Sequence, residues 1–241
     1  MTKALFHIDS YLKEFEAVVV ETHPAESALV LDQTAFFPGG GGQQNDTGEL
    51  LAAGVALPVT KVKWQDGEIW HFVQAASPGE LPQPGARLTG RLDWARRYAM
   101  MRTHTAMHIL CGVIWRDYGA QVTGGNMEPL SARMDFEFES LRAEFVKEIE
   151  ERVNREVAAC REVRVRILPR AEAFQIPDLI RTKVNLLPES LSEIRTVEIA
   201  GLDLQADGGT HVANTREVGK ITIAGYESKG KINKRIKVAL E

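Results

Sequence analysis

The chain has 241 residues, of which 44% are hydrophobic and 26% charged, as in a globular protein with one large or two modest domains. With 29 basic and 33 acidic residues, the net charge of −4 argues against a protein that coats nucleic acid non-specifically, but not against a local basic face. Two cysteines, Cys111 and Cys160, are too few for a disulfide framework and fit a reducing compartment. We find no signal-peptide core and no apolar run near the roughly 18 residues of a membrane helix. These features predict a cytoplasmic protein with no membrane partner, and they leave its oligomeric state open.

Short segments rich in β-branched and aromatic residues dominate the first part of the chain. They occupy residues 17–22, 27–32, 59–64, 68–73 and 87–92. Between two of them, Gln65, Asp66 and Gly67 are typical of a hairpin turn. Short strands with closely spaced turns predict a small antiparallel β-barrel domain over residues 1–90.

A Gly-rich motif lies inside the predicted barrel, in residues 32–48, and contains four consecutive glycines that end at Gly42. Such a backbone can be approached closely by a ligand or another segment, at a cost in conformational entropy. No Gly-Lys-Ser/Thr follows, which argues against a phosphate-binding P-loop. A flexible surface loop is the alternative, although Phe36 and Phe37 favour a segment that docks on the protein.

Helical and strand patterns alternate in the remainder of the chain. Helices are predicted over residues 94–118 and 141–159, with Ser140 as the N-cap of the second helix. Residues 121–129 are rich in turn-forming residues. Strands are predicted at 132–138, 162–168, 194–199, 220–224 and 235–239, the last two as a closing hairpin. The fold class is therefore α+β: the N-terminal barrel is followed by an α+β domain, residues 91–241, with helices packed on an antiparallel sheet.

Two pairs of potential metal ligands lie in this second domain. His104 and His108 are four residues apart on a predicted helix, which places their side chains on one face, roughly 5–6 Å apart at Cβ. Asp207 and His211 flank a glycine pair that permits a tight turn. Together they form a set of three nitrogen donors and one oxygen donor that suits Zn²⁺. Two ordinary core histidines remain the alternative for the helical pair.

Two further features limit the kind of metal site. The helical motif reads His-Thr-Ala-Met-His and lacks the Glu that a zinc peptidase uses as general base. Cys111 lies roughly 10 Å along the helix axis from His104, because each residue rises about 1.5 Å. We therefore expect Cys111 in the core rather than among the ligands.

The most basic stretch of the sequence lies near the C-terminus, in residues 228–235. It is either a solvated hairpin or a patch that contacts RNA phosphates. In the second case the expected RNA-binding residues are Lys229, Lys231, Lys234 and Arg235.

Three segments, in their order along the chain, resemble the editing region of alanyl-tRNA synthetase and the freestanding alanyl-tRNA editing proteins of the AlaX family. Residues 32–48 resemble the Gly-rich motif, residues 104–108 the His-x-x-x-His motif, and residues 207–211 the Cys-Gly-Gly-Thr-His motif. The resemblance covers nearly the whole chain and leaves no room for an aminoacylation domain. The chain is thus similar to the medium-length AlaX proteins.

The resemblance implies a trans-editing hydrolase that acts without ATP on mischarged tRNA-Ala, chiefly Ser-tRNA-Ala, with Gly-tRNA-Ala as a further candidate. It implies Zn²⁺ bound by His104, His108 and His211, with Asp207 where the family usually has Cys. Gly124 stands where the synthetase tends to carry Gln. Other residues expected to contact the substrate are Gly40, Gly41, Gly42, Asn126 and Arg133.

Thr34 is the candidate for recognition of the serine hydroxyl. The alternative is that Thr34 is an ordinary strand residue without a role in recognition. A site that hydrogen-bonds a hydroxyl rejects the analogue that lacks it, because its own polar group is then unpaired. The sequence offers no general base beside the ligands. Two other functions stay open: another metal-dependent aminoacyl-tRNA deacylase or esterase, and a non-catalytic RNA-binding module with a structural zinc.

Overall fold

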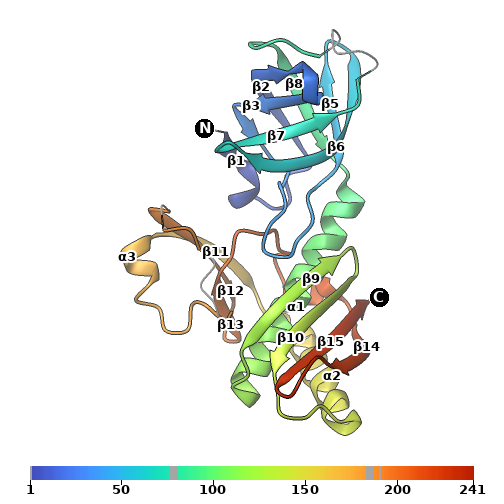
Figure 1. Cartoon of the computed structure of the whole chain (residues 1–241), viewed down its shortest axis with the longest axis vertical. Helices are drawn as coiled ribbons and strands as arrows, with labels where there is room; N and C mark the ends of the chain where they lie inside the picture. The colour runs from blue at the N-terminus through green and yellow to red at the C-terminus, as the bar shows by residue number, and fades with distance from the viewer. Residues whose placement is uncertain (1, 76–80, 183–186, 190) are drawn as a thin grey trace. The chain divides into compact units, whose positions relative to one another are not determined.

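The computed structural model describes residues 2–75, 81–182, 187–189 and 191–241 (Figure 1). The chain divides into two compact units, Met1–Tyr98 and Ala99–Glu241, and the boundary falls inside helix α1 (Trp94–Tyr118). Within the described residues, no helix combines the length and the apolar character needed to cross a membrane.

A closed antiparallel β-barrel forms the first unit, as predicted, with the strand order β2-β3-β7-β6-β5-β8. Its strands are β2 (Glu14–His23), β3 (Ala28–Leu31), β5 (Gly48–Ala52), β6 (Val55–Gln65), β7 (Glu68–Val73) and β8 (Arg87–Leu92). A parallel pair, β1 (Lys3–Ala4) and β4 (Gln33–Thr34), and two short 3₁₀ helices, η1 (Leu5–His7) and η2 (Pro24–Glu26), complete it. The predicted hairpin turn is confirmed, because Asp66 and Gly67 adopt φ values of 53° and 82° between β6 and β7.

The barrel interior is filled by alternate side chains of its strands. Phe15, Leu31, Leu50 and Ile69 are among the buried members of this core. Gly90 in β8 makes room for one of them, because a Cβ at this position would lie 2.4 Å from the Phe15 ring. A bulkier residue at this position would therefore displace an aromatic ring of the core.

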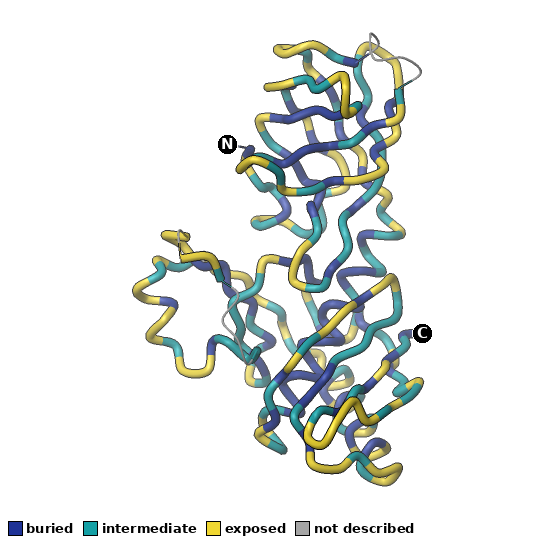
Figure 2. The backbone as a smooth tube through the Cα atoms, in the orientation of Figure 1, coloured by how far each residue is buried: buried dark blue, intermediate teal, exposed yellow. Residues whose placement is uncertain are grey.

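The second unit combines helices with two antiparallel sheets. The larger sheet has the order β14-β15-β10-β9 and the smaller one β11-β12-β13. The strands are β9 (Val122–Glu128), β10 (Ser131–Glu137), β11 (Val163–Pro169), β12 (Glu193–Ile199), β13 (Asp203–Ala206), β14 (Ile221–Ser228) and β15 (Asn233–Leu240). Helices α1, α2 (Ala143–Ala158) and α3 (Arg170–Ala173) and the 3₁₀ helix η4 (Thr215–Val218) accompany them. Figure 1 shows α1 and α2 behind the larger sheet, and Figure 2 shows buried residues along α1. The α+β class and the closing hairpin are thus confirmed.

Two local predictions were wrong. Residues 121–129 contain strand β9 rather than turns alone, because Asn126 and its neighbours pair with β10 despite their weak intrinsic preference for strands. Ser140 is not the N-cap of α2. The N-cap is Arg142, in extended conformation with φ of −106°, which leaves Ser140 too far upstream to reach the first-turn N–H groups.

Candidate metal centre

Helix α1 presents two histidines to the interior of the second unit. His104 and His108 lie one turn apart, are buried, and have ring centroids 5.1 Å apart. The helix forms here because residues 100–111 are rich in Met, Ala, Ile and Leu and contain no Gly or Pro. The helical register therefore brings both imidazoles to one face, as the spacing predicted.

The loop after β13 supplies the second pair of side chains. The Gly209 N–H donates to Asp207 Oδ2 at 2.8 Å, which closes the turn through the glycine pair. Thr105 of α1 holds the far side of this loop: its Oγ1 accepts the Val212 N–H at 3.2 Å and lies 3.2 Å from His211 Nδ1. A helical residue next to His104 thus positions the loop that carries His211.

The four predicted ligands converge on one point. One donor atom from each of His104, His108, Asp207 and His211 can be chosen so that all lie within 4.8 Å of one another. Asp207 Oδ1 lies 3.4 Å from His104 Nε2, and Asp207 Oδ2 lies 2.9 Å from His211 Nε2. A tetrahedral zinc with bonds near 2.0–2.1 Å separates its ligand atoms by roughly 3.3 Å. The two distances from Asp207 are close to this separation.

Electrostatics favour the protonation state that binds metals for most of these groups. Burial lowers the pKa of His104 well below its ordinary value and that of His211 to about 4. Burial acts to raise the pKa of Asp207, but its imidazole neighbours His104 and His211 hold it well below the ordinary value. Burial also acts to lower the pKa of His108, but its hydrogen bond to the Asp203 carboxylate raises it overall. Near neutral pH the site thus contains an ionised carboxylate and neutral imidazoles at His104 and His211, the forms that bind metals.

Cys111 lies outside this set, as predicted. It is buried, and its Sγ accepts a hydrogen bond from Gln205 Nε2 at 3.4 Å. Burial raises the pKa of its thiol beyond the ordinary range, so the sulfur stays protonated. A protonated thiol is a poor zinc ligand.

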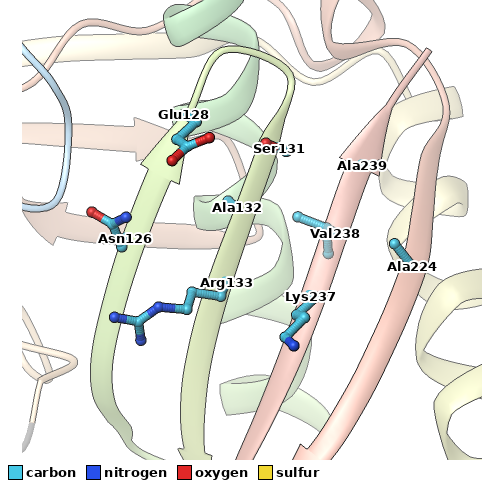
Figure 3. A pocket seen from close by; sticks show the side chains of 9 residues that line it. All are labelled: Asn126, Glu128, Ser131, Ala132, Arg133, Ala224, Lys237, Val238 and Ala239. Atoms are coloured by element: carbon cyan, nitrogen blue, oxygen red, sulfur yellow. The ribbon is translucent and has the colours of Figure 1, made fainter.

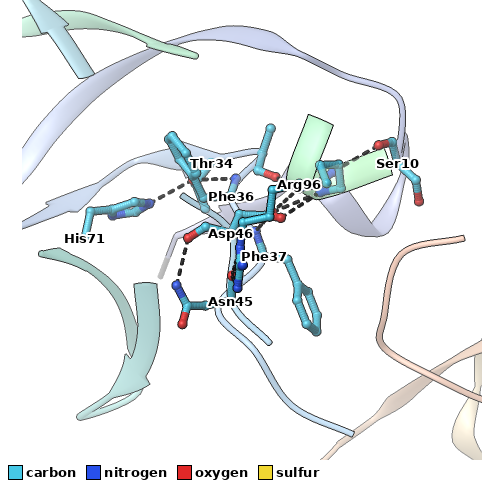
Figure 4. A network of polar contacts seen from close by, with 10 residues as sticks. Ser10, Thr34, Phe36, Phe37, Asn45, Asp46, His71 and Arg96 are labelled. Atoms are coloured by element: carbon cyan, nitrogen blue, oxygen red, sulfur yellow. Dashed lines mark hydrogen bonds and ion pairs between the residues drawn. The ribbon is translucent and has the colours of Figure 1, made fainter. Parts of the chain in front are cut away.

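The Gly-rich motif is an ordered turn held by a buried ion pair within the first unit. Gly40 and Gln43 exchange backbone hydrogen bonds of 3.0 and 2.9 Å. Asp46, at the end of the motif, accepts the Phe37 N–H at 2.7 Å (Figure 4). Its two oxygens also share the Arg97 Nε–H, at 3.1 and 2.9 Å from the nitrogen. Arg97 Nη2 also donates to Asp46 and to the carbonyl of Ala35. The two ends of the motif are therefore fastened to one buried guanidinium, and the four glycines form the tip between them.

Thr34 lies in the interior of the barrel unit, where both the proton and the oxygen of its hydroxyl are engaged. His71 Nδ1 lies 3.2 Å from the Leu29 carbonyl oxygen and therefore carries the proton, because a carbonyl only accepts. Thr34 Oγ1 accordingly donates to His71 Nε2 at 2.8 Å and accepts the Phe36 N–H at 3.1 Å (Figure 4). One lone pair of the hydroxyl oxygen remains for a further donor.

Asn126 and Arg133 lie on one face of the larger sheet. Arg133 is directly opposite Asn126 on one side and Lys237 on the other, so the three side chains project together. They line a groove of about 380 Å³ with Glu128 and Ser131 (Figure 3). Lys237 is a cation of this groove that the sequence did not indicate.

The four basic residues near the C-terminus lie in different environments. Lys229 and Lys231 are exposed. Lys234 is buried, and its Nζ donates to the carbonyl oxygens of Gly230 and Lys231, both at 2.8 Å. Arg235 makes paired hydrogen bonds of 2.7 and 2.8 Å with Asp135. Lys229 Nζ lies 3.9 Å from Glu227 Oε1, so three of the four cations have internal partners.

Several residues of the site escaped the sequence interpretation. Asp203 contacts His108, and Arg195 Nη1 donates to the Asp207 carbonyl oxygen at 2.8 Å. The only signal for Asp203 in the sequence was its position four residues before Asp207. The sequence contains no comparable signal for Arg195. Their roles depend on strand pairing, which brings β12 and β13 beside α1.

Comparisons with known proteins place the chain in a translation context. Residues 194–237 match the family model described as the threonyl and alanyl tRNA synthetase second additional domain, and residues 3–96 match the model of class II (A) tRNA synthetases. The alanyl-tRNA editing protein AlaX-M of Saccharolobus solfataricus is 41% identical over 240 residues, which cover 98% of each chain. The AlaX-M protein of Methanosarcina barkeri is 36% identical over 238 residues, again 98% of each.

A longer relative shares the same region. The alanine–tRNA ligase of Ignicoccus hospitalis is 38% identical over 225 residues, which are 92% of this chain but 24% of the ligase. The similarity to the AlaX-M proteins, in contrast, spans both chains almost completely. With the predicted barrel and the converging His and Asp side chains in place, the chain belongs to the family of the alanyl-tRNA editing proteins AlaX-M.

Proposed function

We propose that this protein is an aminoacyl-tRNA hydrolase that deacylates mischarged tRNA-Ala, chiefly Ser-tRNA-Ala, with Gly-tRNA-Ala as a second candidate substrate. The observation that carries the proposal is the buried cluster of His104, His108, Asp207 and His211 in a chain of the AlaX-M family. Hydrolysis of an ester needs no ATP, and its role would be the fidelity of translation.

Zn²⁺ is the cofactor that the donor set supports best. Imidazole nitrogens with one carboxylate oxygen are common zinc ligands, and four donors match the coordination number that zinc prefers. When bound, the ion supplies Lewis acidity, which polarises a carbonyl or activates water. The residues of the chain hold their donor atoms together, and Gly209 fixes the second oxygen of Asp207.

Thr34 is proposed to recognise the serine side chain. Its proton is directed to His71 and one lone pair to the Phe36 N–H, so the remaining lone pair is the acceptor that the hydroxyl of a seryl ester would have to reach at this fully buried residue. An alanyl ester has no hydroxyl to offer and would leave this acceptor unpaired. The backbone of Gly40, Gly41 and Gly42 is proposed to contact the same substrate.

The tRNA is proposed to contact the groove face of the larger sheet and the hairpin between β14 and β15. Asn126 and Arg133 would bind from the groove. Lys229 and Lys231 are exposed and suit phosphate contacts. Lys234 and Arg235 would join them only if they exchange their present partners for phosphate oxygens.

The test measures bound metal and deacylation of Ser-tRNA-Ala, Gly-tRNA-Ala and Ala-tRNA-Ala on the same preparations. We expect about one zinc per chain in the wild type, and loss of metal and activity together in the double variant His104→Ala/His108→Ala. His23→Ala removes a histidine of the barrel surface and should retain both. Thr34→Val should keep the metal but narrow the preference for seryl over alanyl esters. Full deacylation by the double variant would refute the proposal.

Four protein ligands leave no open position, a feature typical of structural zinc sites. This observation favours, as a second candidate, an RNA-binding module with a structural zinc. Metal binding without deacylation of any aminoacyl-tRNA would support this second function. Deacylation of other mischarged tRNAs but not of tRNA-Ala esters would indicate another metal-dependent deacylase.

A further inference from the structure

A buried carboxylate lies behind one of the proposed metal ligands. Asp203, at the start of β13, has a fully buried side chain, and its Oδ2 lies 3.0 Å from His108 Nδ1. A carboxylate that is ionised can only accept, so the proton of a neutral His108 ring resides on Nδ1. The lone pair is then on Nε2, at the opposite side of the ring.

The approach of Asp203 to the helix depends on a glycine. Gly112 follows His108 by one helical turn and therefore lies on the same face of α1. A Cβ at Gly112 would lie 3.0 Å from both the Asp203 Cβ and the Leu202 Cγ. The missing side chain makes room for β13 against the helix.

Asp203 is itself held by two further residues. Gln205 Nε2 donates to Asp203 Oδ2 at 2.6 Å, and Arg181 Nε lies 3.5 Å from Asp203 Oδ1. The Arg181 guanidinium lies over the Trp115 ring, 4.8 Å from its centroid. A buried carboxylate is costly unless a cation compensates it, and Arg181 on its aromatic support provides this compensation.

We propose that Asp203 is a positioning residue of the metal centre: it fixes the ring of His108 in the tautomer whose Nε2 faces the other donor atoms. The inference rests on the proposed function, since it assumes that His108 binds the ion. Carboxylates that accept the second N–H of a ligating histidine orient the ring and increase its donor strength, and their loss typically weakens metal binding about 10- to 100-fold.

The test measures zinc affinity by competition with a chromophoric chelator, and the protonated ring nitrogen of His108 by ¹⁵N NMR of the metal-free protein. Asp203→Ala should weaken zinc binding about 10- to 100-fold and remove the preference for the Nδ1–H tautomer. Asp203→Asn keeps an acceptor oxygen and should recover part of both. Asp117→Ala is the matched control, because this carboxylate of α1 pairs with Arg116 far along the helix from the ligands and should not alter zinc affinity.

Three outcomes would overturn the inference. The first is wild-type zinc affinity in folded Asp203→Ala, and the second is an Nε2–H tautomer in the metal-free wild type. The third is a zinc affinity of Asp203→Asn no higher than that of Asp203→Ala. If Asp203→Ala does not fold, the zinc affinity of Asp203→Asn and the His108 tautomer of the wild type still test the inference. A wild type that binds no zinc would instead refute the proposed function, and the NMR measurement would then test the Asp203 contact by itself.

Discussion

His71 should make the stability of the barrel unit depend on pH. The side chain lies inside the barrel on strand β7, and burial lowers its pKa from 6.5 to about 4, while its hydrogen bond to Leu29 acts in the opposite direction. Protonation would place a charge beside the Thr34 hydroxyl and turn Nε2 from an acceptor into a donor. The folded state therefore favours the neutral ring.

The sign and size of the effect follow from the two pKa values. Because the folded-state pKa lies below that of the unfolded chain, this contribution to stability is fully present above pH 6.5 and is lost as the pH falls toward 4. A separation of about 2.5 pH units corresponds to about 3 kcal/mol in total, of which about 2 kcal/mol is lost between pH 7 and pH 5.

Two measurements check this prediction. An NMR titration of His71, assigned by comparison with His71→Gln, should give a pKa well below 6.5. The difference in unfolding free energy between wild type and His71→Gln should change by about 2 kcal/mol between pH 7 and pH 5, in the direction that disfavours the wild type at low pH. A His71 pKa near 6.5, or a difference that does not vary with pH, would refute the reasoning.

Substitutions at Asp46 and Asp207 give two further predictions. Asp46→Ala leaves the Arg97 guanidinium buried without its carboxylate, so urea denaturation should show a loss of unfolding free energy of about 3–5 kcal/mol. Glu14→Ala, at an exposed ion pair, should cost less than about 1 kcal/mol. Equal costs would contradict the stabilising role of the buried Asp46–Arg97 ion pair. Asp207→Cys should bind zinc at least as tightly as the wild type and Asp207→Ala more weakly, as measured by chelator competition, because thiolate is the stronger zinc ligand. Wild-type affinity in Asp207→Ala would place this residue outside the ligand set.

The sequence predicted those features that depend on local periodicity. The barrel followed from short strands and turn residues, and the hairpin at Asp66 and Gly67 from its turn chemistry. The convergence of His104 with His108 followed from helical spacing alone. Their approach to Asp207 could be proposed because the two pairs together supply the four donor atoms of a zinc site. Local sequence patterns, however, do not show whether segments a hundred residues apart lie close together in space.

Features that depend on strand pairing could not be predicted in this way. Asp203 reaches His108 only because β13 pairs with β12 and packs beside Gly112. The partners of Lys234 and Arg235 could not be predicted either, because nothing in the sequence indicates that these two cations are already paired. Their partners are carbonyl oxygens of their own hairpin and the Asp135 carboxylate on a strand a hundred residues away. Charge counts in a sequence therefore overstate the number of cations that can bind RNA.

Contacts on the outer side of the donor atoms orient three of the four candidate metal ligands. His108 is held by Asp203 through Nδ1, and His211 lies beside the Thr105 hydroxyl through Nδ1, so each ring directs its Nε2 toward the interior of the cluster. A backbone N–H engages one oxygen of Asp207, and the other oxygen faces inward. On the inner side, His211 Nε2 lies 2.9 Å from Asp207 Oδ2 and His104 Nε2 lies 3.4 Å from Asp207 Oδ1, so the carboxylate is the common neighbour of two rings. The fold thus fixes the outer side of three donors, and a metal ion would satisfy their inner sides at once.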